Sequence, residues 1–141
     1  MVSAIDATKP IDGILASKGD LRANLLAAKT EIEALQAVSV PVRATLHVSG
    51  GADGTYYAYL DAPALTIASL TAVTTGTRSC TAAVRIEGID VTSLDAVSVT
   101  TSKATTNATG ANTVNAGDEV TVVLSAGAGS GDVILSVNGS A

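Results

Sequence analysis

Apolar residues recur with a helical period in one long stretch near the start of the chain. Five of them follow one another at intervals of four, three, four and three residues, namely Leu21, Leu25, Ala28, Ile32 and Leu35. This spacing places them on one stripe of a helix and matches the a and d positions of a heptad repeat. Ser17 is a suitable N-cap, and Pro41 disfavours helical geometry in the residue before it. We therefore predict an amphipathic helix over residues 17–37.

The predicted helix needs a surface to cover its stripe. An isolated helix of this length is marginal in water, and two heptads are too few to sustain a coiled coil on their own. Two alternatives remain open. The stripe packs on the chain's own β domain, or it packs on sister copies or a larger partner, with Ala28 allowing close approach at its centre.

The first sixteen residues have no period and contain Pro10 and Gly13. They also hold four large aliphatic residues at irregular spacing, which are Ile5, Ile11, Ile14 and Leu15. We predict an extended arm over residues 1–16 whose aliphatic side chains lie on a surface of this subunit or of another protein. The alternative is a mobile chain end.

After Pro41 the apolar period changes to two, which is typical of half-buried strands. Residues 42–49 and 55–60 flank the glycine-rich segment 50–54 and are predicted to form a β-hairpin. Five further segments are predicted as strands: residues 65–73, 79–88, 97–99, 119–125 and 132–139, with Ile89 and Val91 as a short edge. Residues 100–112 form a polar stretch rich in Thr, Asn and Ser. Seven to nine short strands predict an antiparallel β-sandwich or jelly-roll-like domain over residues 41–141, so the chain is mainly β.

Composition narrows the range of functions. The hydrophobic fraction of 47% consists mostly of Ala and Val, and aromatic residues make up only 2%, so we expect a thin core. The net charge is −5, with no basic run to neutralise nucleic-acid phosphates, which argues against direct nucleic-acid binding. We see neither a signal peptide nor a run of 18 uncharged apolar residues, and expect no membrane span and folding in the cytoplasm.

Groups that carry chemistry are sparse. His47 is the single histidine, and Cys80 is the single cysteine and is expected to be a small core residue. The glycine-rich segments 50–54 and 127–131 read as hairpin loops. Alternation places Tyr57 and Tyr59 on one face and Tyr56 on the other, for core or interface packing or, alternatively, for sugar stacking. We expect no enzyme activity, no cofactor and no metal site.

Two segments carry a resemblance. The run IDATKPIDGILASKGDLRANLLAAKTEIEAL resembles a segment at the start of virion structural proteins of tailed bacteriophages and prophages. The segments ADGTYYAYLDAPALTIASLTAVT and VSVTTSKATTNATGANTVNAGDEVTVVLSAG are similar to β domains of phage head-decoration and head-fibre proteins.

The resemblance implies a non-enzymatic capsid decoration or cement protein on the virion surface. Such proteins are usually trimers whose N-terminal segment attaches to the major capsid protein. We therefore expect the oligomer or capsid interface at Ile5, Ile11, Ile14, Leu15, Leu21, Leu25, Ala28, Ile32 and Leu35. The alternative is a tail-fibre or tail-tip component whose β domain binds a host-surface glycan.

Overall fold

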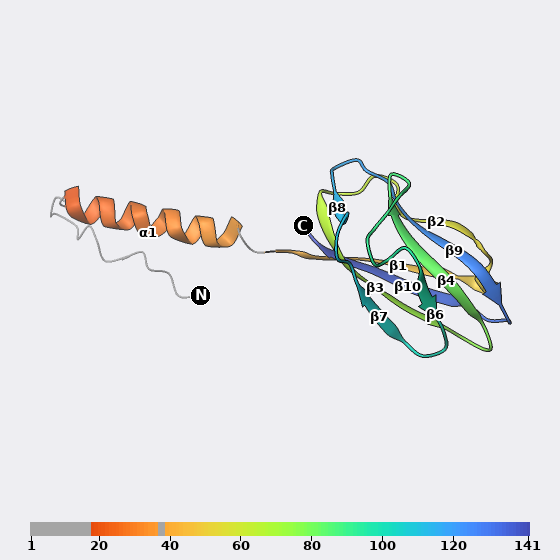
Figure 1. Ribbon diagram of the computed structural model, residues 1–141. Helices are drawn as coiled ribbons and strands as arrows, with labels where there is room; N and C mark the ends of the chain where they lie inside the picture. Colours follow the sequence, from red (N-terminus) through yellow and green to blue (C-terminus); the bar gives the residue numbers. More distant parts are fainter. Residues whose placement is uncertain (1–17, 37–38) are drawn as a thin grey trace. The chain divides into compact units, whose positions relative to one another are not determined.

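The computed structural model describes residues 18–36 and 39–141 and divides the chain into two compact units, with the boundary between Ser39 and Val40. The first unit contains the helix α1 (Lys18–Gln36), drawn in orange in Figure 1. The predicted arm, with Ile5, Ile11, Ile14 and Leu15, lies outside the described residues, as do the ends of the predicted helix at Ser17 and Ala37.

Local interactions favour a helix over residues 18–36, but only weakly. Asp20 lies in the first turn, where a negative charge is favourable near the helix N-terminus. Lys29 Nζ lies 3.6 Å from Glu33 Oε1 one turn later, and such an exposed pair contributes only a few tenths of a kcal/mol. Helix propensity and side-chain pairing therefore stabilise the helix only weakly. Burial of its apolar stripe against another surface would stabilise it more.

The second unit, Val40–Ala141, consists of two antiparallel five-stranded sheets that pack face to face (Figure 1). Sheet A has the order β1-β10-β3-β7, with β8 also pairing with β3. Its strands are β1 (Pro41–Val48), β3 (Leu65–Thr74), β7 (Ala104–Asn107), β8 (Thr113–Val114) and β10 (Val133–Ser140). Sheet B has the order β2-β9-β4-β5, with β6 also pairing with β4. Its strands are β2 (Gly54–Tyr59), β4 (Ser79–Ile86), β5 (Ile89–Asp90), β6 (Val97–Val99) and β9 (Val120–Ala128).

The strand pairs form one long antiparallel ribbon that folds back on itself. β1 pairs with β10, β2 with β9, β3 with β7 and β8, and β4 with β5 and β6. Wrapping this ribbon into two sheets is the topology of a jelly roll. The expectation of a mainly β chain with a jelly-roll-like sandwich is confirmed.

The predicted hairpin between residues 42–49 and 55–60 is wrong. A short 3-10 turn, η1 (Ser49–Gly51), follows β1, but β1 belongs to sheet A and β2 to sheet B. The segment 127–131 likewise leads from β9 in sheet B to β10 in sheet A. A two-residue hairpin occurs instead between β4 and β5, where Glu87 and Gly88 both have positive φ, as a type I′ turn requires.

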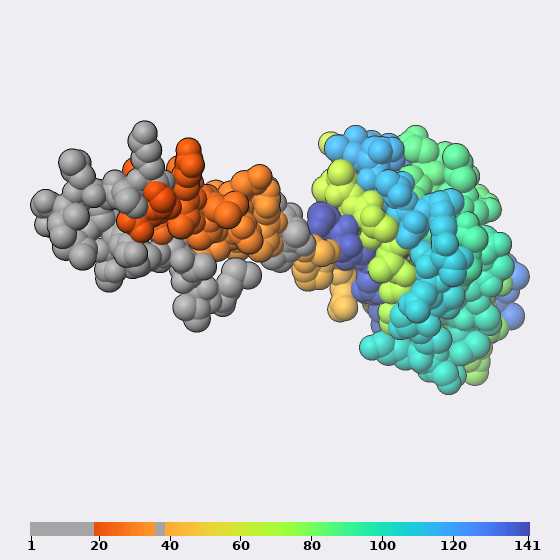
Figure 2. All heavy atoms as spheres, turned by 60° about the vertical axis from the view of Figure 1, so that its left-hand side comes forward, coloured from red at the N-terminus to blue at the C-terminus, as the bar shows by residue number. Residues whose placement is uncertain are grey.

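The polar stretch 100–112 supplies a strand that its sequence does not predict, because β7 pairs along the edge of β3. In Figure 2 residues 104–114, in teal and cyan, run along β3, in yellow-green. An edge strand buries little, so its composition stays polar and carries no apolar period.

The core lies between the two sheets and is built from aliphatic side chains of both. Its largest fully buried members are Ile67, Leu70, Leu94, Leu124 and Leu135, surrounded mainly by valines and alanines. Cys80 is buried in this core as a free thiol, and burial raises the pKa of its thiol. The valine-rich strands of the sequence thus form a sandwich that closes over its own core.

Candidate functional site

The apolar stripe predicted on the helix is exposed. The side chains of Leu21, Leu25, Ile32 and Leu35 are between 48% and 70% exposed, and Ala28 between them is partly exposed. Their spacing keeps all five within one face of α1, because each turn takes 3.6 residues. The four large side chains offer an apolar strip that a partner surface would bury.

Leu26 is a further exposed leucine that the heptad pattern does not include. It is 65% exposed, close to the 70% of Leu25, but lies about 100° around the helix from it. Leu26 and Leu25 are the same residue type with nearly the same exposure, but they point to different sides of the helix. A substitution at Leu26 is therefore a matched control for a substitution in the stripe.

The outer face of sheet A carries an ordered array of polar side chains. Antiparallel register places Thr45, Ser136, Thr71 and Thr105 in one row across four strands. Thr45 Oγ1 and Ser136 Oγ lie 2.8 Å apart, and Thr71 Oγ1 and Thr105 Oγ1 lie 2.9 Å apart. Hydroxyl pairs of this kind connect neighbouring strands through their side chains.

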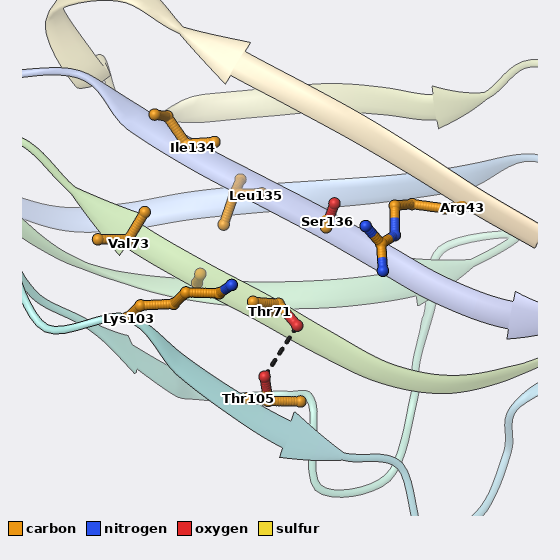
Figure 3. A pocket seen from close by; sticks show the side chains of 9 residues that line it. Arg43, Thr71, Val73, Lys103, Thr105, Ile134, Leu135 and Ser136 are labelled. Atoms are coloured by element: carbon orange, nitrogen blue, oxygen red, sulfur yellow. Dashed lines mark hydrogen bonds between the residues drawn. The ribbon is translucent and has the colours of Figure 1, made fainter.

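A hollow of about 310 Å³ lies in this face, and we call it the sheet A hollow. It is lined by Arg43, Thr71, Ala72, Val73, Lys103, Thr105, Ile134, Leu135 and Ser136. In Figure 3 the guanidinium of Arg43 lies beside Ser136, and the ammonium of Lys103 reaches over β3 towards Thr71. Arg43 comes from β1 and Lys103 from the residue before β7, at opposite edges of sheet A. Both cationic groups therefore line the same hollow on the outer face.

Arg43 is held in this position by a chain of hydrogen bonds. Its Nε donates to Asn138 Oδ1 at 2.9 Å. The amide nitrogen of Asn138 donates in turn to Ser69 Oγ at 3.3 Å and to Thr71 Oγ1 at 3.2 Å. No local sequence signal predicts this site, because Arg43, Lys103 and Ser136 come from three distant segments.

A second polar cluster lies at the end of the sandwich where β1 ends. Arg78, whose side chain is only 9% exposed, donates from Nη2 to the carbonyl of Gly51 and, at 3.0 Å, to Asp53 Oδ1. Asp53 also accepts a bond from the backbone N–H of Gly127 at 3.1 Å. The cluster joins the connection after β1, the connection after β3 and the end of β9, so it acts as a structural clamp.

His47 is paired with a carboxylate at the start of β10. Its Nε2 lies 3.0 Å from Asp132 Oδ2, while Asp132 Oδ1 accepts the backbone N–H of Gly50 at 2.8 Å. These two hydrogen bonds hold the pKa of the Asp132 carboxyl below its usual value, and the bond from Gly50 has the larger effect. The pair ties β1 to the start of β10, and the structure shows no hydroxyl or thiol bonded to the imidazole in residues 39–141.

The tyrosines do not form one exposed patch. Tyr56 and Tyr59 pack against the core, while Tyr57 is 51% exposed. A bulge between Tyr57 and Tyr59 breaks the alternation that predicted these two rings on one face, so that prediction is wrong. Burial raises the pKa of the Tyr59 hydroxyl.

Two kinds of feature are absent from residues 18–36 and 39–141, a metal-binding group of side chains and a membrane-spanning helix. No group of three or more His, Cys, Asp or Glu side chains is arranged to hold a metal ion in this part of the chain. Within the same ranges, the length and hydropathy needed to span a membrane are met by no helix.

No protein-family model matches the chain, and a search of curated proteins finds none that is similar to it.

Proposed function

We propose that this protein is a non-enzymatic structural component of a tailed-phage virion, a capsid decoration or cement protein that binds the assembled head as a homotrimer. The exposed apolar stripe of α1 is the observation that carries the proposal. The sequence resemblance in residues 5–35 and in the β domain supports the same function.

The division of labour between the two units fits an attachment role. The core cluster of the β domain is drawn entirely from residues 42–137, so this domain has its own source of stability. The leucines and isoleucine of α1 contribute to no such cluster in the described residues. Burying the four exposed side chains on a partner would contribute on the order of 5 kcal/mol per helix before association costs.

The proposed mechanism is linkage between binding and assembly. A protein that binds only the assembled shell stabilises that state, by about 2.7 kcal/mol per site when its free concentration is a hundred times its dissociation constant. Three copies held in one trimer, each on its own capsid site, would add avidity without new contacts. The arm and α1 would bind the major capsid protein or sister subunits, and the β domain would project outward.

A pair of matched helix variants tests the role of the stripe. We expect Leu25→Asp to reduce the number of copies on purified particles at least tenfold, and the double variant Leu25→Asp with Ile32→Asp to abolish binding, because a buried unpaired carboxylate is costly. Occupancy is measured by quantitative mass spectrometry against the major capsid protein.

Leu26→Asp is the control, since it adds the same charge to the same helix away from the stripe. It is expected to leave occupancy within about twofold of the wild type. Thermal unfolding of the β domain, followed through its tyrosines, verifies that each variant folds. Equal occupancy for the Leu25 and Leu26 variants would reject α1 as the attachment element.

A tail-fibre or tail-tip component that binds a host glycan is the second candidate. The tyrosines do not supply an exposed stacking cluster for it, but the sheet A hollow offers another surface. Copy number separates the two functions. Hundreds of copies over the head support decoration, and a handful at the tail supports host attachment.

A further inference from the structure

We propose that the sheet A hollow is a binding site for an anionic sugar, a hydroxyl-bearing ligand with a carboxylate or phosphate group. The inference goes beyond the proposed function and does not depend on α1, because every residue that lines the hollow belongs to the β domain.

The distribution of charge is the first argument. Residues 40–141 contain eight acidic and four basic residues. Arg78 pairs with Asp53, and Arg85 pairs with Asp90. The two remaining cations, Arg43 and Lys103, have no ion pair with any carboxylate in the described part of the chain, and both line the hollow. None of the eight acids lines it, so an anion meets attraction without a competing carboxylate.

The preorganisation of Arg43 is the second argument. Its Nε is used by Asn138, which fixes the direction of the guanidinium, whereas the structure gives its terminal nitrogens no hydrogen-bond partner in residues 18–36 and 39–141. A guanidinium held at Nε still offers donors to a carboxylate or phosphate. Figure 3 shows it turned towards the centre of the hollow.

The remaining lining suits a sugar. Thr71, Thr105 and Ser136 supply hydroxyls that both donate and accept hydrogen bonds, and Val73 and Ile134 supply apolar contact. The volume of about 310 Å³ lies at the lower end of the range for small-molecule sites, which fits one sugar unit. An anionic sugar uses the cations, the hydroxyls and the apolar contacts together.

The test is a titration of the full chain, followed by amide chemical shifts and by saturation transfer to the ligand. The probes are glucuronate, glucose 6-phosphate, neutral glucose and inorganic phosphate. We expect saturable shifts at Thr71, Thr105 and Ser136 with at least one of the two anionic sugars, and at least roughly tenfold weaker binding of glucose and of inorganic phosphate. A preference for glucuronate identifies a carboxylate sugar, and a preference for glucose 6-phosphate a phosphorylated one.

The variant Arg43→Gln with Lys103→Gln is expected to weaken binding of the preferred probe more than tenfold. Arg85→Gln removes a positive charge from sheet B and is expected to leave binding unchanged. The proposal is overturned if no probe gives saturable shifts at the hollow, if glucose binds as tightly as the anionic sugars, or if inorganic phosphate matches glucose 6-phosphate. None of these outcomes affects the particle assay with the α1 variants, so the two proposals fail separately.

Discussion

At the scale of single residues, Arg78 is the buried charge on which the end of the sandwich depends. Its guanidinium bonds to the Gly51 carbonyl and to Asp53, while Nε is buried with no hydrogen-bond partner in the described residues. Asp53 itself is about half exposed. Removing Asp53 thus leaves a buried cation without its counter-charge, whereas removing Arg78 leaves an acid that water can solvate.

We therefore expect Asp53→Ala to destabilise the fold by about 3 kcal/mol and Arg78→Met by about half as much, since Met retains the apolar stem. The two changes combined are expected to cost less than their sum, because they remove the same interaction. Urea unfolding of the four proteins gives the comparison. A larger loss for Arg78→Met than for Asp53→Ala would contradict this account of the clamp.

Asp132 makes stability depend on pH. The Gly50 N–H and then His47 favour its ionised form, so its pKa in the folded chain lies below that in the unfolded chain. A group of this kind stabilises the fold above its unfolded pKa of about 4, and the stabilisation is lost as pH falls through the lower folded pKa.

The expected result is that Asp132→Asn is less stable than the wild type between pH 5 and 7, and that the difference shrinks below about pH 4. Thermal unfolding measured from pH 2.5 to 7 provides the test. Asp95→Asn is the matched control, because the structure gives Asp95 no hydrogen bond or ion pair in residues 39–141, and this variant should be about as stable as the wild type at pH 7. A constant gap for Asp132→Asn across the whole range would refute the argument.

At the scale of elements, strand faces were predictable but strand partners were not. Alternation in β1 and β10 identifies their inward residues, because the period of two is carried by consecutive side chains. The partner of β1 is β10, about ninety residues later, rather than the neighbouring β2. A glycine-rich turn allows the chain to reverse either as a hairpin within one sheet or as a connection to the other sheet. Burial of the shared core decides between these two connections.

The bulge in β2 shows the same limit within one strand. Regular alternation assigns Tyr57 and Tyr59 to one face, but the register shift between them against β9 lets Tyr59 pack on the core while Tyr57 is exposed. Packing the Tyr59 ring against the core removes apolar surface from water, which offsets the local loss of ladder regularity at the bulge. Next to a bulge, the two-residue alternation of a strand therefore does not predict which face a large side chain occupies.

At the scale of the whole molecule, the chain joins a domain with a closed core to a helix with an uncovered stripe. We expect a fragment of residues 40–141 to fold alone and to unfold within a few degrees of the β domain in the full chain, since the core cluster lies wholly within it. Sedimentation equilibrium should find the fragment monomeric and the full chain trimeric. A fragment that associates as the full chain does would move the oligomer contact into the β domain, and an unfolded fragment would contradict the independence of its core.

Sequence alone determined the features that neighbouring residues encode. These are the amphipathic helix near residues 18–36, the inward faces of the valine-rich strands and the mainly β class, all of which follow from local period and composition. Tertiary structure alone decided the jelly-roll pairing, the Arg78 clamp and the sheet A hollow. Each of these unites residues far apart in the chain, as Arg43 and Lys103 are, and such contacts form only when burial of the whole core selects one strand order.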